Sequence, residues 1–270
     1  MTSRPRPPVI ETPIVEAMDS YIRGFPMPMA VTLTVPLNAD VVINDGRVPR
    51  PPMDMPTTFT RASDGAVTHG GGEYEARLPP RYTVEANDFP VDCVDLDPGE
   101  PRRVLFDAAG LQGEDPLPAG RYRVELSFRK VAAPPFDIVV RHPTPAEQVE
   151  LARIQKLDSD WMFSLPSNKL PPPILPGDPF RYMKVVHFLY TTPTPPSKVD
   201  LRLLNVLDGF FAPEALLLRF ELAQLREDTA AQESTEQAIR SHHQSSVPAL
   251  QKLKAHGGYI PFYRDLHFGR

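Results

Sequence analysis

The spacing of hydrophobic residues changes once along this chain, near residue 143. Before that point apolar and polar residues alternate, as in the run Val31, Leu33 and Val35. A period of two is typical of a strand with one buried face. After it, apolar residues recur every three or four positions, as Leu218, Leu222 and Leu225 do, which indicates helices. The sequence therefore predicts an α+β protein with two unlike regions.

The first region, residues 26–142, contains many short apolar runs separated by Gly, Pro or Asp. Regular short strands of this kind favour an antiparallel β-sandwich or barrel. The predicted strands cover residues 31–35, 41–44, 57–61, 73–78, 81–87, 91–96, 102–106, 122–128 and 136–140. A proline-rich segment, residues 1–25, precedes them, and its stretch Ile14–Ile22 is predicted to form one or two helical turns.

The second region, residues 143–256, is predicted to be helical. Thr144 offers an N-cap and Pro145 a first-turn proline, which together indicate the start of a helix. Further helices are expected over residues 181–190, 199–210, 214–225, 229–241 and 249–255. The 34 prolines agree with this division, because 22 lie in residues 1–145 and only 3 in residues 197–270, and proline breaks helix interiors.

Two short motifs carry a resemblance to a known fold. The stretch from Leu117 to Val124, with Tyr122 entering a strand, resembles the tyrosine corner of immunoglobulin-like and fibronectin-like sandwiches. The turn Asp97-Pro98-Gly99-Glu100 is similar to one in bacterial members. The resemblance covers about residues 26–142 and implies an immunoglobulin-like β-sandwich. It implies no activity, because such folds host unrelated functions.

A second resemblance lies in the helical region. Pro145, Pro179, Pro213 and Pro248 recur at intervals of 34 or 35 residues, each where a helix is expected to begin. This period is similar to that of tetratricopeptide helical hairpins. Packed helical hairpins without repeat ancestry are the alternative.

Charge and cysteine content exclude several classes of function. The net charge of −5 argues against a nucleic-acid partner. No apolar run is long enough for a signal peptide or a membrane span, so a cytoplasmic protein is expected. Cys93 is the only cysteine, so neither an intramolecular disulfide nor a four-cysteine zinc site can form.

The residues that suggest chemistry each have a simpler structural explanation. The run from His69 to Gly72 resembles an esterase oxyanion loop, but no serine lies in Gly-x-Ser-x-Gly, so a glycine-rich hairpin tip is expected. Cys93, flanked by carboxylates, is expected to be structural. His242 and His243 are expected to be exposed at a helix end. An acidic set is expected to form a solvated strand face: Glu85, Asp88, Asp92, Asp95, Asp97 and Glu100. No catalytic residue, metal ligand or cofactor is assigned.

The sequence favours a non-enzymatic protein-interaction or scaffold module in a larger cytoplasmic assembly. The aromatic C-terminal tail, residues 257–270, either packs on the protein's own helices or docks on a protein partner. Its candidate partner-binding residues are Tyr259, Phe262, Tyr263, Leu266 and Phe268. One alternative is a hydrolase with a site near His142 and Trp161, at the junction of the two regions. Another is a carbohydrate- or calcium-binding sandwich. The oligomeric state is left open.

Overall fold

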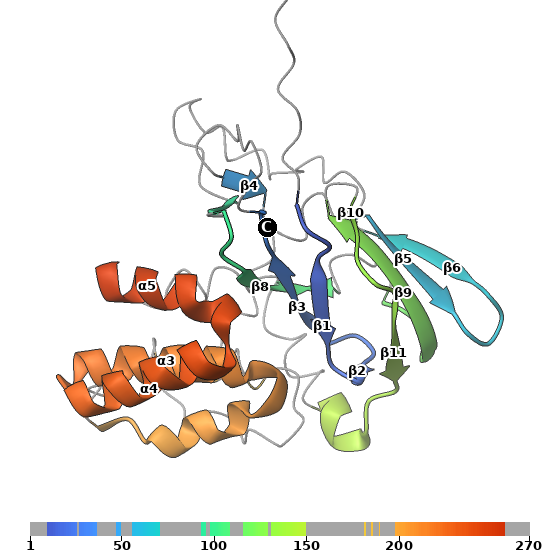
Figure 1. Ribbon diagram of the computed structural model, residues 1–270. Coiled ribbons are helices and arrows are strands. Elements are labelled where there is room, and N and C mark those ends of the chain that lie inside the picture. The colour runs from blue at the N-terminus through green and yellow to red at the C-terminus, as the bar shows by residue number, and fades with distance from the viewer. Residues whose placement is uncertain are drawn as a thin grey trace, which may run out of the picture.

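The structure, a computed structural model, describes the chain in segments. The described residues are 10–25, 27–36, 47–49, 56–70, 93–95, 98–108, 116–128, 131–149, 181, 185, 189 and 198–256. Within them, strands occupy the N-terminal half and helices occupy the C-terminal part (Figure 1). The expected change from strands to helices near residue 143 is therefore confirmed over the part of the chain that is described.

A three-stranded antiparallel sheet lies at the centre of the molecule. Its strands are β1 (Ile14–Ala17), β3 (Pro28–Leu33) and β8 (Arg102–Asp107), in the order β1-β3-β8. All residues of the middle strand, β3, are buried. A strand buried at every position must be covered on both faces of its sheet.

A second, larger sheet runs in the order β2-β11-β9-β5-β6, with β10 added to β9. Its strands are β2 (Ser20–Ile22), β5 (Thr57–Arg61), β6 (Val67–Gly70), β9 (Gly120–Phe128), β10 (Val131–Ala132) and β11 (Phe136–Arg141). Only the pairing of β2 with β11 is parallel among these described strands. Buried and exposed residues alternate along β9, so one face of this sheet meets solvent. A separate antiparallel pair joins β4 (Arg47–Pro49) and β7 (Cys93–Asp95).

The register of the central sheet determines what covers each of its faces. Directly opposed residues of neighbouring strands project from the same face. Glu16, Ala30 and Leu105 lie opposite one another, and Ala30 and Leu105 belong to a core shared with the helices. Val15 and Val31 project from the other face and pack in the core shared with the larger sheet. The central sheet thus stands between the helices and the larger sheet, as Figure 1 shows.

The C-terminal part consists of α-helices and short 3-10 helices. They are η4 (Leu201–Leu207), η5 (Gly209–Phe211), α3 (Ala212–Leu225), α4 (Thr229–His242), η6 (Gln244–Ser246) and α5 (Val247–His256). Residues 145–149, 181, 185 and 189 are also helical. Pro213 stands in the first turn of α3, where it removes no helical hydrogen bond. The side chain of Asp228 caps α4 by accepting a hydrogen bond from the Ala231 N–H, 3.0 Å away.

Helix α3 is the centre of the helical core. It is buried over most of its length and contacts α4, α5 and η4. Figure 1 shows α3, α4 and α5 lying beside one another. The expected helices at 214–225, 229–241 and 249–255 are confirmed as α3, α4 and α5. Pro145, Pro213 and Pro248 each stand in the first turn of a helix, whereas Pro179 lies outside the described residues.

Two local predictions are wrong. Ile14–Ile22, expected to form helical turns, forms the strands β1 and β2, because its backbone groups pair with β3 and β11. Residues 199–210, expected to form one helix, form η4 and η5, two 3-10 helices separated at Asp208. Gly209 has a φ of 70°, a left-handed conformation that interrupts a right-handed helix and that glycine adopts at little cost.

The corner at Tyr122 forms as predicted. The Tyr122 side chain is buried, and its hydroxyl donates a hydrogen bond of 2.8 Å to the carbonyl oxygen of Pro118. Tyr21 plays a similar part at the start of the chain. Its hydroxyl accepts from the Met18 N–H and donates to the Pro28 carbonyl oxygen, at 2.8 and 2.9 Å.

Candidate functional site

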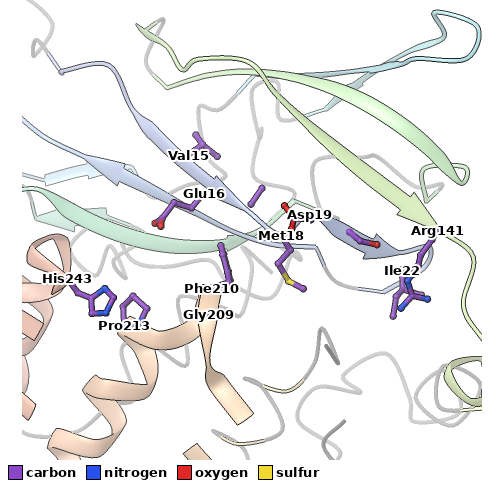
Figure 2. Close-up of a pocket in the computed structure, with 12 residues that line it drawn as sticks. Val15, Glu16, Met18, Asp19, Ile22, Arg141, Gly209, Phe210, Pro213 and His243 are labelled. Atoms are coloured by element: carbon purple, nitrogen blue, oxygen red, sulfur yellow. The ribbon is translucent and has the colours of Figure 1, made fainter. Parts of the chain in front are cut away.

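A pocket of about 870 Å³ opens where the central sheet, the larger sheet and the helices meet. Figure 2 shows its lining residues projecting from all three parts. The strand side is Val15, Glu16, Ala17, Met18, Asp19, Ser20, Ile22 and Arg141, and the helix side is Gly209, Phe210, Pro213 and His243. The site therefore exists only when both halves of the chain are folded together.

The chain crosses from one sheet to the other along this pocket. β1 belongs to the central sheet and β2 to the larger one, and Met18 and Asp19 connect them. The bond from the Met18 N–H to the Tyr21 hydroxyl fixes this crossing. Six consecutive residues thus form one wall of the pocket, so main-chain groups as well as side chains are available to a ligand.

A buried arginine anchors the helix side of the pocket to the sheet. Arg103 of β8 donates from Nε to Oε1 of Glu214 at 2.9 Å, and from Nη2 to the Phe210 carbonyl oxygen at 2.9 Å. Its Nη1 donates to Oε2 of Glu16 on the pocket wall. The guanidinium also lies over the Phe210 ring, 5.2 Å from the ring centroid. A single side chain therefore joins β1, β8, η5 and α3.

Burial changes the ionisation of two groups near this arginine. Glu214 is 2% exposed, and its burial raises the pKa of the carboxyl, although the Arg103 guanidinium opposes the shift. Among the described residues, Oε2 of Glu214 has no hydrogen-bond partner. Burial, followed by the charge of Arg103, lowers the pKa of His243 below 6.5, against an opposing effect of Glu16. His243 is therefore mainly neutral at neutral pH.

Arg141, which lines the opposite end of the pocket, forms an ion pair at the exit of β11. Arg141 donates from both terminal nitrogens to Glu147, at 2.8 and 2.7 Å. Glu147 also accepts from the Thr144 N–H at 2.7 Å, while its own N–H donates to the Thr144 hydroxyl at 3.3 Å. These reciprocal bonds form a capping box at the start of the helix at 145–149. The bond from Arg141 is the main cause that lowers the pKa of Glu147 to about 2.

The pocket offers charged, apolar and main-chain groups to a ligand. Glu16 is held by Arg103 and Arg141 by Glu147, so two of the charged side chains in the pocket have structural partners. Asp19 is exposed, and apolar surface comes from Met18 and Phe210. A mixture of apolar surface, carboxylates and main-chain groups is what a protein segment can use.

The candidate residues predicted from sequence lie elsewhere or outside the described part. The five aromatic and apolar residues of the tail, and Trp161, fall outside it, as do Glu85, Asp88, Asp92 and Asp97. Cys93 and Asp95 lie in β7, and Glu100 follows a turn. His142 is exposed beside the pocket-lining Arg141.

Two expectations about histidines need correction. His69 and Gly70, expected at a glycine-rich tip, lie within β6, and the turn after β5 is made by residues 62–66. Gly71 and Gly72 lie outside the described residues, so the rest of that prediction is not tested. Nδ1 of His69 lies 3.4 Å from the Thr58 hydroxyl. His242 ends α4 and is exposed as expected, but His243 is half-buried in the pocket because the chain turns into η6 there.

The sequence predicted no role for the three residues that join the strands and helices at the site, Glu16, Arg103 and Glu214. Arg103 stands in the predicted strand at 102–106, whose sequence leaves open which face is buried. Glu214 stands in the first turn of α3, where acidic residues are common because they interact favourably with the helix N-terminus. The sequence of β8, Arg102-Arg103-Val104-Leu105-Phe106-Asp107, does not alternate, so no pattern in it indicated that the Arg103 side chain is buried.

Other classes of site receive no support from the described residues. Within them, no group of three His, Cys, Asp or Glu side chains is placed to hold a metal ion. None of the described helices combines the length and apolarity needed to cross a membrane. Comparisons with family models, curated proteins and solved structures find no match to this chain.

Proposed function

We propose that the strand region is an immunoglobulin-like β-sandwich. The order β1-β3-β8 corresponds to strands A, B and E of that fold, and β11-β9-β5-β6 corresponds to G, F, C and C′. The core shared by the two sheets and the tyrosine corner at Tyr122 support the assignment. In the helical region, the contact between α3 and α4 across a short turn supports a helical hairpin. A tetratricopeptide-like origin for this hairpin remains a proposal based on the proline spacing.

The protein's function, in our proposal, is non-enzymatic: it is a protein-interaction or scaffold module in a larger cytoplasmic assembly. The observation that carries this proposal is the pocket between the sheets and helices, whose wall offers main-chain groups, carboxylates and apolar surface together. The ion pairs of Arg103 and Arg141 support a preformed site rather than a group of titrating residues. A preformed site lowers the entropic cost of binding a partner.

The test is affinity capture with a charge-reversed pocket. The protein would be immobilised and exposed to extract from the organism that encodes it, and bound proteins would be identified by mass spectrometry. Asp19→Arg is the test variant, because Asp19 is exposed in the pocket. Glu125→Arg is the matched control, since Glu125 is exposed on β9, outside the pocket lining. We expect some partner proteins to be captured by the wild type and by Glu125→Arg but not by Asp19→Arg. If all three proteins capture the same partners, the pocket is not the binding site.

The tail is proposed as a second contact with partners, through Tyr259, Phe262, Tyr263, Leu266 and Phe268. Truncation after His256 tests this, because α5 and the core it covers remain intact. Loss of captured partners with an unchanged melting temperature is expected. A melting temperature several degrees lower would instead assign the tail to the protein's own core.

A hydrolase remains the second candidate, because Glu16, Asp19 and His243 line one pocket at the junction of the two halves. Neutral His243 would be its general base. Hydrolysis of ester, phosphate and glycoside model substrates by the wild type, abolished in His243→Ala, would favour this candidate over the interaction module. Equal rates in both proteins would remove His243 from consideration.

A further inference from the structure

The hydrogen-bonding pattern of the central sheet shows which main-chain groups of β1 face the pocket. The Ala108 N–H bonds the Met27 carbonyl, so in the pairing of β3 with β8 the odd-numbered residues of β3 bond to β8. The even-numbered residues Ala30 and Thr32 therefore bond to β1, through Glu16 and Ile14. The N–H and C=O groups of Val15 and Ala17 consequently point away from the sheet.

These outward groups lie at an open edge. β1 is an edge strand among the described strands, and both Val15 and Ala17 line the pocket. Main-chain donors and acceptors at an exposed edge are a template for an added strand. Two outward residues offer two N–H donors and two C=O acceptors, which matches a partner segment of about four residues.

The side chains around this edge select the partner's chemistry. Glu16 is 52% exposed at its side chain although it contacts Arg103, and Asp19 is exposed a few residues further along. Arg141 is paired with Glu147 and Glu16 with Arg103, so the exposed carboxylate of Asp19 sets the charge that a ligand meets, and the exposed part of Glu16 adds to it. Met18 and Phe210 supply apolar surface between them. Opposite charge is favoured beside such carboxylates.

We propose that the partner is an extended peptide segment with alternating apolar and basic residues, which adds to β1 as a further strand of the central sheet. The inference deepens the proposed function and rests on it. The added strand bonds the main chain of Val15 and Ala17. Its basic side chains lie on the face of Glu16 and Phe210, and its apolar side chains lie on the opposite face, that of Val15 and Ala17.

A defined probe tests this inference directly. A fluorescein-labelled octapeptide of alternating valine and lysine is titrated with the full chain and followed by anisotropy. A second octapeptide carries glutamate in place of lysine. We expect saturable binding of the lysine peptide and at least about tenfold weaker binding of the glutamate peptide, since charges a few ångströms apart near a surface differ by more than 1.4 kcal/mol on reversal. Absence of binding, or equal binding of both peptides, overturns the inference.

Variants separate strand addition from simple charge attraction. Ala17→Pro removes one outward N–H and none of the bonds to β3, since proline is tolerated on an edge strand in this position. Val67→Pro is the matched control, because Val67 is on β6, an edge strand of the larger sheet among the described strands. The bond from the Arg61 N–H to the Ala66 carbonyl places the N–H of Val67 on the outer side. Ala17→Pro is expected to weaken binding about tenfold, and Val67→Pro to leave it unchanged.

Amide hydrogen exchange gives a second readout. The amides of Val15 and Ala17 should exchange quickly in the free protein and slowly with the lysine peptide bound, while those of Ile14 and Glu16 are protected in both states. Strand addition is overturned if the lysine peptide protects only amides other than those of Val15 and Ala17. It is also overturned if Ala17→Pro binds the lysine peptide as tightly as the wild type does. If affinity capture yields partners that depend on Asp19 but neither peptide binds, the proposed function stands and only the inference of strand addition is removed.

Discussion

At the scale of single residues, two buried tyrosines hold the chain at corners of the sheets. Tyr122 bonds the carbonyl of Pro118 just ahead of β9, and Tyr21 bonds both Met18 and Pro28 around the crossing that borders the pocket. Both rings are almost fully buried. A buried main-chain group that loses its partner carries the full cost of desolvation, so these hydroxyls stabilise the fold through the groups they satisfy.

Replacing each tyrosine by phenylalanine should therefore destabilise the protein to different extents. Tyr122→Phe is expected to lower the free energy of unfolding by about 0.5–1.5 kcal/mol. Tyr21→Phe should cost about twice as much, because it leaves both the Met18 N–H and the Pro28 carbonyl without that partner. Urea denaturation followed by circular dichroism measures both values. An unchanged midpoint for Tyr122→Phe would argue against the corner and against the immunoglobulin-like proposal.

At the scale of elements, the exit from β11 into the helix at 145–149 depends on one capping box. Thr144 and Glu147 satisfy each other's main-chain N–H groups, and Arg141 at the end of β11 bonds the same carboxylate. The strand, the cap and the first helical turn are thus joined over seven residues. This element also places Arg141 in the wall of the pocket.

The ionisation of Glu147 predicts how this cap responds to pH. Its pKa is lowered from 4.5 to about 2 in the folded protein, first by Arg141. Its contribution to stability is therefore complete above about pH 4.5 and is lost as the pH falls through about 2. Glu147→Gln keeps the capping box and removes the charge. We expect this variant to be less stable than wild type by about 1 kcal/mol at neutral pH, since Arg141 is partly exposed.

Denaturation of both proteins at a series of pH values checks this expectation. The difference between wild type and Glu147→Gln should shrink below about pH 4.5 and nearly vanish near pH 2. Asp137→Asn serves as a control, because Asp137 pairs with Arg123 on a largely exposed strand face. A difference that is constant with pH would exclude the charge of Glu147 as its cause.

At the scale of the whole molecule, the sheet and the helices share one core. Ala30 and Leu105 from the central sheet pack with Leu204, Phe211 and other helical residues. The buried pair of Arg103 and Glu214 crosses the same boundary. The apolar surface that this core would expose is unfavourable in water, so each half covers the other.

Breaking the buried pair should therefore destabilise both halves together. Arg103→Met leaves the Glu214 carboxyl buried without its partner and is expected to cost about 3–5 kcal/mol. The double variant Arg103→Met with Glu214→Leu should regain most of that loss, because an apolar pair can replace a buried ion pair. Arg123→Met, at an exposed pair, is the control and should change stability by less than about 1 kcal/mol.

Two probes test whether the halves unfold as one unit. Urea titrations followed by far-ultraviolet circular dichroism, which reports mainly on the helices, and by hydrogen exchange of the amides of β3 and β9, which reports on the sheets, should give coincident transitions in each variant. Separate transitions in Arg103→Met would show that the pair couples two halves that are stable independently.

Local pattern was sufficient for several elements. The alternation in β9 and β11 predicted both strands, and proline placement with three- and four-residue spacing predicted α3. It failed at Ile14–Ile22, whose strands are determined by pairing with β3, the next strand of the central sheet, and with β11, far along the chain. It also failed at 199–210, where Gly209 divides the helix. The candidate tail residues lie outside the described part, so that prediction stands untested.

The sequence by itself determined the change of period near residue 143, the turn residues between strands and the corner at Tyr122, because each depends on neighbours within a few positions. Only the tertiary structure decided that Glu16, Arg103 and Glu214 meet, and that the main chain of β1 faces a pocket. These contacts join residues about 90 and 110 positions apart. Which face of β8 is buried depends on the helices that cover it, and a period of two describes both faces equally well.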